Sequence, residues 1–457
     1  MDLAYILAAS LFIVGLKKLN SPKTARAGNF LAAFGMLIAI VATLLDRQVV
    51  SFQMIGVSLL IGSVLGAILS ETTKMTAMPQ MVAMLNGFGG IASALVAWSE
   101  YDRHLPLIEP TTLVTTLLAV LVGAVTFSGS MLAYGKLEGW VPQQPIVYPL
   151  QQPVNFTIAL ACVGLGALIM THQALVPAFW GLFAISLLLG VLIVLPIGGA
   201  DMPVIISLLN SLSGVAGALT GFVLMNKVLI VSGALVGSSG IILSELMCKA
   251  MNRSLANVLF GAFGKAPAAP TGVKAAQGEY VNVKSASPEE ATMILETASL
   301  VIMVPGYGLA VSRAQHSLKQ LADLLESRGA HVKYAIHPVA GRMPGHMNVL
   351  LAEAEVPYNQ LYEMEVINPE FDRADVALVV GANDVVNPSA RNEPGSPIYG
   401  MPILNVDKAR SILVIKRSLA SGFAGIKNPL FENDKTMMLF GDAKEMLDQL
   451  VKELKSL

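Results

Sequence analysis

The first 255 residues alternate long apolar runs with short polar loops. A helix needs roughly 20 apolar residues to cross the hydrocarbon core of a membrane. Nine runs approach or reach that length: residues 4–16, 30–45, 52–69, 78–98, 112–134, 157–170, 177–195, 202–225 and 228–246. The first and sixth runs are short, and we expect flanking residues to extend these two helices. The pattern predicts an all-α polytopic membrane domain with about nine transmembrane helices over residues 1–263.

The pattern changes after residue 263. Residues 264–288 carry Ala, Pro, Gly and polar side chains, which is typical of a linker. Residues 289–457 then alternate short β-branched runs with helical periodicity, which indicates a parallel sheet covered by helices on both faces. We expect strands at 299–304, 331–337, 376–380, 402–406, 412–415 and 437–440, and helices at 310–328 and 443–457. The second half is therefore predicted to be an α/β Rossmann-like domain.

Composition agrees with two physically different halves. Of the 61 Asp, Glu, Lys and Arg residues, 20 lie in residues 1–255 and 41 in the remaining 202 residues. The net charge of −1 offers no electrostatic basis for binding nucleic acid. Cys162 and Cys248 both lie in apolar segments, and they provide neither a metal-ligand spacing nor a disulfide framework.

Lysine and arginine are unevenly distributed between the two sets of loops. One set, with the last expected helix end, carries Lys17, Lys18, Lys23, Arg26, Lys74, Lys136, Lys249 and Arg253. The opposite loops carry Arg47, Arg103 and Lys227, mostly singly and beside acids. Because cytoplasmic loops are enriched in positive charge, we expect the N-terminus outside and the C-terminal domain in the cytoplasm. An odd number of spans agrees with this orientation.

The first expected strand of the α/β domain runs into a glycine-rich turn. Gly306 would permit a tight turn, and Gly308 would let the backbone approach a pyrophosphate at the N-terminus of the next helix. Val311 occupies the place of the usual third glycine. Glycine-rich turns between strands and helices are common, but the strand before this one and the helix after it favour a dinucleotide site.

The choice between NAD and NADP depends on the end of the second strand. NAD-binding sheets usually place Asp or Glu there, where the carboxylate accepts from the ribose 2′-hydroxyl. Residues 334–337 contain no acid. Lys416, Arg417 and Ser418 follow a later strand and offer two cations and a hydroxyl to a 2′-phosphate. A solvated Lys–Arg pair is the simpler interpretation of these residues alone, and the missing acid makes NADP the favoured cofactor.

Two long polar segments follow expected strands at the edge where ligands bind. They are residues 337–346 and 381–388, and both contain Gly or Asn residues that permit close approach to a cofactor. Loops of this kind are either lids or ordinary surface.

Polar residues inside the expected spans are few. Asn86, Ser130 and Asn210 lie within spans, Asp201 lies near the start of the eighth, and Glu245 lies near the end of the ninth. Such groups are costly in a membrane and often mark an ion path, although Asn86 or Asn210 equally fits an interhelical hydrogen bond. No histidine lies in the middle of an expected span, so the sequence offers no obvious titratable group there.

Two other classes of protein have the same composition. A channel or transporter could use a Rossmann domain only to sense a nucleotide, but the spans contain no sequence typical of a selectivity filter, and the long loops suit an exposed nicotinamide. A soluble-type NADP dehydrogenase anchored by helices would need a second substrate domain, for which no residues remain.

Eight motifs occur along the chain in a fixed order. They are residues 201–203, 210–211, 233–240, 247–254, 305–308, 337–348, 381–384 and 416–418. Together they resemble the beta subunit of bacterial proton-translocating NAD(P) transhydrogenase, over essentially the whole chain. The resemblance implies a Re/Si-specific transhydrogenase of the bacterial inner membrane. In it, hydride passes directly between NADP(H) on this chain and NAD(H) on a partner alpha subunit, coupled to proton translocation.

The resemblance implies further properties. NADP(H) is expected in the reverse of the usual Rossmann orientation, the alpha subunit is expected to add membrane helices, and the assembled complex is expected to be a dimer. Asn210 and Asp201 match polar residues of the family's membrane domain, and Asp384 is expected to change contact with the nicotinamide during a conformational switch. The family's NADP(H) contacts carry over onto Gly306, Tyr307, Gly308, Val339, Ala340, Gly341, Arg342, Met343, Pro344, Gly381, Ala382, Asn383, Asp384, Val385, Gly400, Met401, Lys416, Arg417, Ser418, Gly422, Phe423, Asp442 and Ala443.

One position departs from the family pattern. Much of the family has a histidine in the fourth span where this sequence has Asn86. An amide does not titrate, so Asn86 cannot replace an imidazole as a proton carrier. We therefore expect a membrane segment of the partner subunit to supply the titratable residue.

Overall fold

The computed structural model describes residues 2–19, 22–45, 52–74, 77–142, 144–251, 254–255, 258, 280–343, 345–422 and 424–457. Two compact units divide the chain. Met1–Pro196 and Ile205–Leu243 form the first, and Ile197–Val204 and Ser244–Leu457 form the second. Residues 264–279 of the predicted linker lie outside the described residues, and the domain boundaries drawn from the sequence stay predictions.

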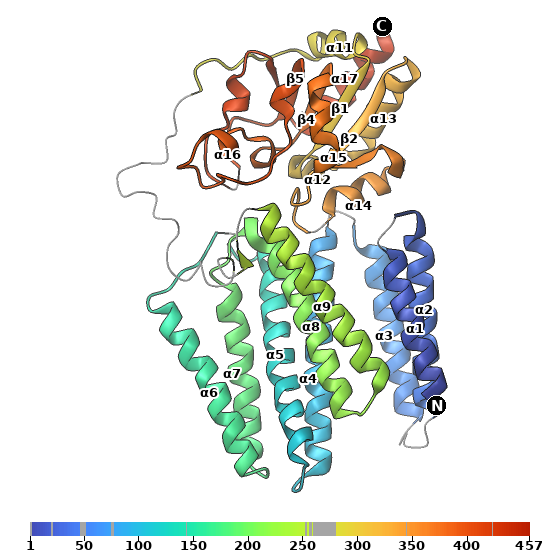
Figure 1. The fold of residues 1–457 in the computed structure, drawn as a ribbon, viewed down its shortest axis with the longest axis vertical. Coiled ribbons are helices and arrows are strands. Elements are labelled where there is room, and N and C mark those ends of the chain that lie inside the picture. The colour runs from blue at the N-terminus through green and yellow to red at the C-terminus, as the bar shows by residue number, and fades with distance from the viewer. Residues whose placement is uncertain are drawn as a thin grey trace. The chain divides into compact units, whose positions relative to one another are not determined.

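Long helices form the N-terminal half (Figure 1). They are α1 (Asp2–Leu19), α2 (Pro22–Leu44), α3 (Phe52–Thr72), α4 (Met78–His104), α5 (Pro110–Glu138), α6 (Gln151–Thr171), α7 (Val176–Val194), α8 (Met202–Val223) and α9 (Lys227–Ala250). Within the described residues, the eight from α2 to α9 are long and apolar enough to cross a membrane. The exception, α1, has 18 residues and carries Asp2, Lys17 and Lys18 at its ends. As predicted, flanking residues extend the sixth run, and α6 has 21 residues.

Glycines bring particular helices of the first unit into close contact. A Cβ on Gly90 of α4 would lie 2.7 Å from the carbonyl oxygen of Gly123 on α5, and a Cβ on Gly123 would lie 2.5 Å from that of Gly90. A Cβ on Gly214 of α8 would lie 2.5 Å from the backbone nitrogen of Gly237 on α9. Small residues allow such backbone contact in lipid, so these glycines are packing sites. By contrast, α3 has no buried residue.

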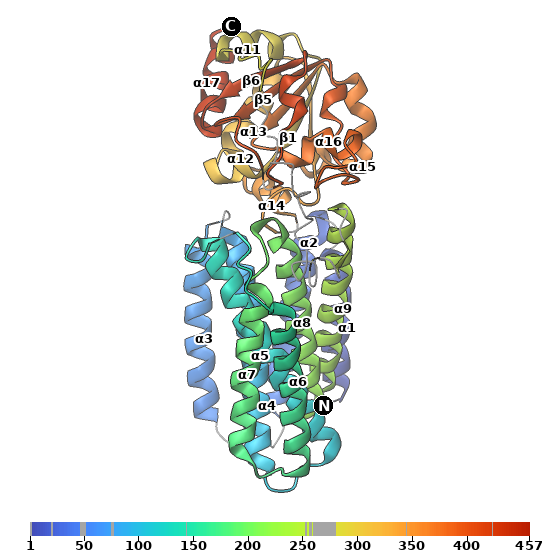
Figure 2. The same ribbon diagram turned by 90° about the vertical axis from the view of Figure 1, so that its left-hand side faces the viewer.

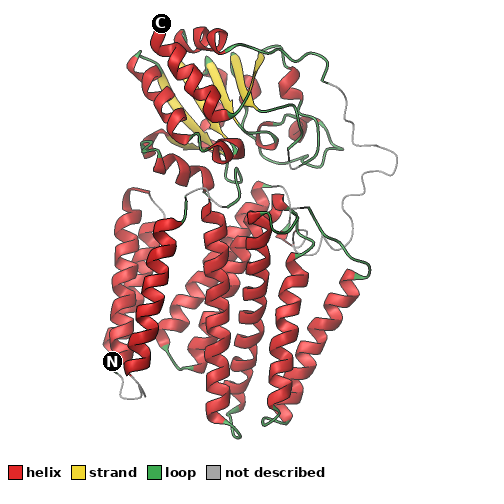
Figure 3. Cartoon of the chain, turned by 180° about the vertical axis from the view of Figure 1, so that it is seen from behind, coloured by secondary structure: helices red, strands yellow, loops and turns green. Residues whose placement is uncertain are grey.

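The second unit contains a six-stranded parallel sheet, drawn in yellow in Figure 3. Its strands are β1 (Leu300–Pro305), β2 (His331–Ile336), β3 (Leu361–Glu363), β4 (Val376–Val380), β5 (Ser411–Lys416) and β6 (Thr436–Phe440). Their order in the sheet is β3-β2-β1-β4-β5-β6. This is the doubly wound order, in which ligands bind beyond the carboxyl ends of the strands where the order reverses, here between β1 and β4.

Helices cover both faces of the sheet, as predicted (Figure 2). They are α11 (Pro288–Glu296), α12 (Tyr307–Ser312), α13 (Gln315–Ser327), α14 (His346–Glu353), α15 (Met364–Ile367), α16 (Ser389–Asn392) and α17 (Ala443–Ser456). Alternate residues of β1 belong to different cores, since Val301 packs with residues of α11, α13 and α17, whereas Ile302 packs with residues of α15. Side chains alternate across a strand, so one apolar run serves both faces.

One predicted strand is wrong. Residues 402–406 do not enter the sheet, in which β5 lies directly between β4 and β6. The segment packs its apolar side chains, Ile403, Leu404 and Val406, in the interior, and each is at most 3% exposed. A buried apolar run and a strand look alike in sequence, and only the available partners distinguish them.

The helix predicted over residues 310–328 is also wrong in its extent. It begins earlier, at Tyr307, and breaks at Arg313, whose φ of 51° lies in the left-handed region. The result is the six-residue helix α12 followed by α13. The three-residue edge strand β3 and the helix α11, with its Ser287–Glu290 capping box, were not predicted.

Candidate functional site

A cavity of about 600 Å³ lies in the second unit at the carboxyl edge of the sheet. Segments after five strands, β1, β2, β4, β5 and β6, line it, and they include most of the predicted binding residues. The lining residues include Gly306, Tyr307, Gly308, Val311, Ser312, Val339, Ala340, Gly341, Gly381, Ala382, Asn383, Asp384, Val385, Met401, Lys416, Arg417, Ser418, Gly422 and Ala443. Residues distant in sequence thus meet at the position where open α/β sheets bind ligands.

Gly306 and Gly308, which follow β1, leave room for the turn after β4 to pack against them. The amide of Gly308 donates to the carbonyl of Gly381 at 2.9 Å, and a Cβ on Gly308 would lie 2.6 Å from the Gly381 Cα. Gly306 has ordinary extended backbone, with φ −124° and ψ −173°, but a Cβ there would lie 2.5 Å from the backbone of Ala382. The Gly306 carbonyl accepts from the Leu309 amide at 3.1 Å, and both glycines also allow two turns to pack together beneath the cavity.

Two buried histidines organise the loop after β2. His337 accepts from the Val339 amide at Nδ1 (3.3 Å), so its Nε2 carries the proton and donates to the Pro402 carbonyl (2.9 Å). His346 accepts from the Arg342 amide at Nδ1 (2.9 Å). Gly341 has a φ of +111°, and a Cβ on it would meet the His346 ring. This loop brings Val339, Ala340 and Gly341 to the cavity.

The pKa of both His337 and His346 is lowered from 6.5 to about 4, mainly by burial, and the Arg342 charge contributes to the lowering at His346. Because the unfolded chain binds these protons near pH 6.5, their stabilising effect is complete above that pH and is lost as the pH falls toward 4. Each shift corresponds to about 3 kcal/mol. We expect the loop to open progressively below pH 6.5, seen as faster hydrogen exchange after correction for the intrinsic pH dependence of exchange.

His346→Asn provides the control for this pH dependence. Asparagine retains an acceptor for the Arg342 amide but does not titrate. Exchange in the loop should be faster than in the parent at pH 7.5 and should depend less on pH between 6.5 and 5. An unchanged pH dependence in both His346→Asn and His337→Asn would contradict this assignment.

Arg342 connects this loop to the first turn. Its guanidinium lies 4.6 Å from the centroid of the Tyr307 ring, a cation–π contact. Burial raises the pKa of the Tyr307 hydroxyl, and the Arg342 charge opposes that shift. Tyr307 is therefore a neutral, half-buried residue at the start of α12.

The side chains of Lys416 and Arg417 contact different partners, although the two residues are adjacent and were expected to act together as one cationic pair. The Arg417 Nη2 donates to Asp442 Oδ2 at 2.7 Å, and Ser312 Oγ donates to the same oxygen at 2.8 Å. Lys416 donates to the Ala420 carbonyl, and its ammonium lies 5.5 Å from the centroid of a phenylalanine ring. Burial lowers the pKa of Lys416, while the Asp384 charge raises it. Arg417 thus lies beside α12 and α17, and Lys416 lies toward Asp384.

Asp384 contacts the loop that follows Ser418. Its Oδ2 accepts from the Ala424 amide at 3.0 Å. A Cβ on Gly422 would lie 2.5 Å from Asp384 Oδ1, so the carboxylate would have to move to admit a side chain at position 422. Asp384 therefore contacts this loop at Gly422 and Ala424, both of which line the cavity.

The remaining predicted binding residues lie around these groups. Val339, Val385 and Met401 pack in one apolar cluster with Ile398. Gly400 has a φ of +80°, and Met343 is 7% exposed. Asp442 caps α17 by accepting from the Lys444 amide at 3.0 Å, and Ala443 follows it. Pro344 and Phe423 lie outside the described residues.

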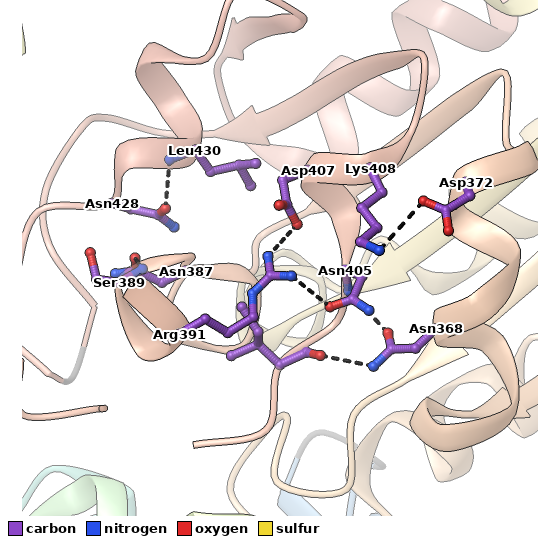
Figure 4. Close-up of polar contacts among 11 residues, drawn as sticks. Asn368, Asp372, Asn387, Ser389, Arg391, Asn405, Asp407, Lys408, Asn428 and Leu430 are labelled. Carbon is purple, nitrogen blue, oxygen red and sulfur yellow. Dashed lines mark hydrogen bonds and ion pairs between the residues drawn. The ribbon is translucent and has the colours of Figure 1, made fainter. Parts of the chain in front are cut away.

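A polar network that the sequence did not reveal holds residues 400–408 (Figure 4). Arg391 donates to Asn405 Oδ1 at 3.1 Å and to Asp407 Oδ1 at 2.5 Å. Asn368 donates to the Ile403 carbonyl and accepts from the Asn405 amide, both at 3.0 Å. These contacts replace the sheet pairing predicted for this segment, and no short sequence motif identifies them.

Two of the polar residues singled out in the helical half, Asn86 and Glu245, have ordinary structural contacts. Asn86 is 5% exposed, and its Nδ2 donates to the Ile206 carbonyl of α8 at 3.2 Å. Asn210 lies on α8, and Asp201 lies in the 3-10 turn before α8. Glu245 pairs with Lys249 along α9 at 3.2 Å. Among the described residues there is no cluster that could hold a metal ion.

The fold and cavity define a class: a membrane protein with a Rossmann-like nucleotide-binding unit. A sequence model of the NAD(P) transhydrogenase beta subunit matches residues 1–453. Two proteins named NAD(P) transhydrogenase subunit beta, both from Rhodospirillum rubrum, are each 49% identical over 460 residues. Each alignment covers 99% of this chain and 98% of the relative. The chain belongs to the NAD(P) transhydrogenase beta subunit family.

Proposed function

We propose that the cavity binds NADP(H) and that this chain exchanges hydride with NAD(H) on a partner alpha subunit, as a Re/Si-specific transhydrogenase coupled to proton translocation. One observation carries the NADP(H) assignment. The position after β2, where an NAD site has an acid, holds buried His337, whereas Arg417 and Ser418 lie at the cavity after β5. A cation and a hydroxyl suit a 2′-phosphate.

The residues around the cavity fit such a ligand. The packed glycine turns keep side chains out of the carboxyl edge of the sheet, Arg417 lines the cavity, and Arg342 adds positive charge over the ring of Tyr307, which also lines it. The cofactors supply the hydride chemistry when bound, so the chain's task is to position them and exclude water. In this proposal Asp384, through the Ala424 amide, fixes the position of Ala424 at the cavity.

The proton-translocating part of the proposal concerns Asn86, Asn210 and Asp201. Because the Asn86 amide is used in a helix–helix hydrogen bond and does not titrate, the proposal assigns the titratable group to the partner subunit. One proton crossing ~100 mV provides ~2.3 kcal/mol. That free energy would shift a two-state NADP(H) site by about 50-fold. The N-terminus lies outside and the nucleotide unit lies in the cytoplasm in this proposal.

A vesicle experiment tests the function. The chain is co-expressed with the neighbouring alpha subunit genes, and sealed membrane vesicles receive NADPH and an oxidised NAD analogue. We expect reduction of the analogue at the expense of NADPH, movement of protons into or out of the vesicle, and a changed rate on adding an uncoupler.

Three arms make the outcome decisive. Vesicles with either subunit alone should show no reduction. NADH in place of NADPH should be a much poorer donor at this chain's site. Replacing every intramembrane histidine of the partner should abolish proton movement, and intact movement would refute the assignment of the proton carrier to the partner.

A further inference from the structure

Asn428 is a fully buried residue that has no role in the function proposed above. It is 0% exposed. Its Nδ2 donates both to the carbonyl oxygen of Asn383 (3.1 Å) and to Asn383 Oδ1 (3.0 Å), and its Oδ1 accepts from the Leu430 amide (3.0 Å). Both amide hydrogens and the oxygen are therefore used, which is what a buried amide requires.

Asn383, which accepts hydrogen bonds from the Asn428 side chain, lies at the cavity. Asn383 and Asp384 are consecutive, and both line it. The Asn383 carbonyl also accepts from the Val386 amide at 3.1 Å, so Asn428 supports the whole turn after β4. The Asp384 carboxylate then holds the Ala424 amide. A shift of Asn428 would therefore move the carboxylate that contacts residues 420–424.

On its other side, Asn428 contacts the segment that enters the α/β unit. Its backbone amide donates to the Tyr280 hydroxyl at 3.0 Å. The Tyr280 ring lies 6.1 Å from the ring of Phe431, centroid to centroid, and the Lys416 ammonium lies 5.5 Å from the Phe431 centroid. Tyr280 is thus connected to residues of the cavity in two ways: by a hydrogen bond through Asn428, and by ring contacts through Phe431.

The segment bearing Tyr280 is attached along its length. The Val281 amide donates to Glu432 Oε1 at 2.7 Å. Farther on, the Ala286 amide donates to the Met438 carbonyl at 3.0 Å, so this segment runs beside β6. Because these other bonds anchor the segment, removing the Tyr280 hydroxyl should alter Asn428 without detaching the segment.

We propose that Asn428 and Tyr280 are positioning residues for the Asn383–Asp384 turn, and that they connect the segment entering the α/β unit to the cofactor cavity. The ligand named in the test rests on the proposed function, but the contact itself does not. Neither residue touches the reacting atoms. Each acts by fixing where Asp384 and Lys416 lie.

Two variants test the proposal in the full chain with its partner. Tyr280→Phe keeps the ring but removes the acceptor for the Asn428 amide. We expect the Kd for NADPH, from its fluorescence, to change about fivefold, equivalent to about 1 kcal/mol. Asn428→Asp keeps the shape but cannot donate to Asn383 when ionised, and a change of about tenfold or more is expected.

Tyr362→Phe is the matched control, because it removes a hydroxyl from β3, at the far edge of the sheet. Its Kd should equal the parent's. Hydrogen exchange provides a readout that needs no ligand: Tyr280→Phe should speed exchange at Val386 and Ala424 and leave β1 unchanged. A general loss of stability would instead speed exchange in β1 as well.

The outcomes separate this inference from the proposed function. If the parent fails to bind NADPH, the proposed function is wrong, and the exchange data still decide the inference. If the parent binds but Tyr280→Phe matches Tyr362→Phe in both Kd and exchange, the positioning role is overturned. If Asn428→Asp does not fold, Tyr280→Phe decides alone.

Discussion

Replacing Arg417 with methionine should weaken NADP(H) binding by about 100-fold while leaving NAD(H) binding within about threefold. Methionine retains an apolar stem but removes the guanidinium. Charge-assisted hydrogen bonds to a phosphate are worth roughly 1.5–3 kcal/mol, which corresponds to about one to two decades of affinity. The measurement is a titration of each nucleotide against the same preparation, followed by NADPH and NADH fluorescence.

Arg410→Met is the matched control for Arg417→Met. The two arginines flank β5, and Arg410 precedes the strand, where it pairs with Asp375 at 2.9 Å. Losing Arg410 removes the same charge from the unit without changing the cavity. Equal losses of NADP(H) and NAD(H) affinity in Arg417→Met would mean that this arginine does not read the 2′-phosphate.

Replacing Asp384 with asparagine should speed NADPH release and lower coupled transhydrogenation, each by about tenfold. The amide retains an oxygen for the Ala424 amide but removes the negative charge that faces Lys416. The Lys416 ammonium, just before that loop, then loses a nearby negative charge. Release is followed by displacement of NADPH with excess NADP⁺, and coupling by the effect of an uncoupler on the rate in vesicles.

Asp372→Asn serves as the comparison for Asp384→Asn. Asp372 is an exposed residue that pairs with Lys408 at 3.6 Å, away from the cavity lining. Its replacement should change neither release nor coupling. If Asp384→Asn also leaves both unchanged, Asp384 takes no part in the switch, and the role assigned to it here fails.

Much of the site could be recognised in the sequence because strand ends are recognisable. Gly306, Gly381 and Lys416 each lie at or directly after a buried apolar run, and parallel strands bring their carboxyl ends to one edge. The sequence could not separate Lys416 from Arg417, because neighbouring side chains leave a strand in opposite directions and their partners come from elsewhere. Ser312 and Asp442 meet Arg417 from positions 105 and 25 residues away.

Asn428 and residues 402–406 both show what the sequence alone does not reveal. Asn428 looks like an ordinary loop asparagine, and only its contacts with Asn383 and Tyr280 give it a role. The run at 402–406 is as apolar as a strand, yet it is not among the six strands of the sheet. Hydrogen-bond partners distant in sequence have no local pattern, because they depend on the assembled sheet.

By itself, the sequence determined the helical membrane half, the parallel-sheet half and the glycine turn, and it predicted a preference for NADP. These features depend on apolar length, on side-chain periodicity and on charge, all of which are local. Only the tertiary structure decided which partners Lys416 and Arg417 contact and why position 308 requires glycine. It also decided how Tyr280 is connected, through Asn428 and Asn383, to Asp384. Those depend on contacts between segments that meet only after folding, so their geometry exists only in the folded chain.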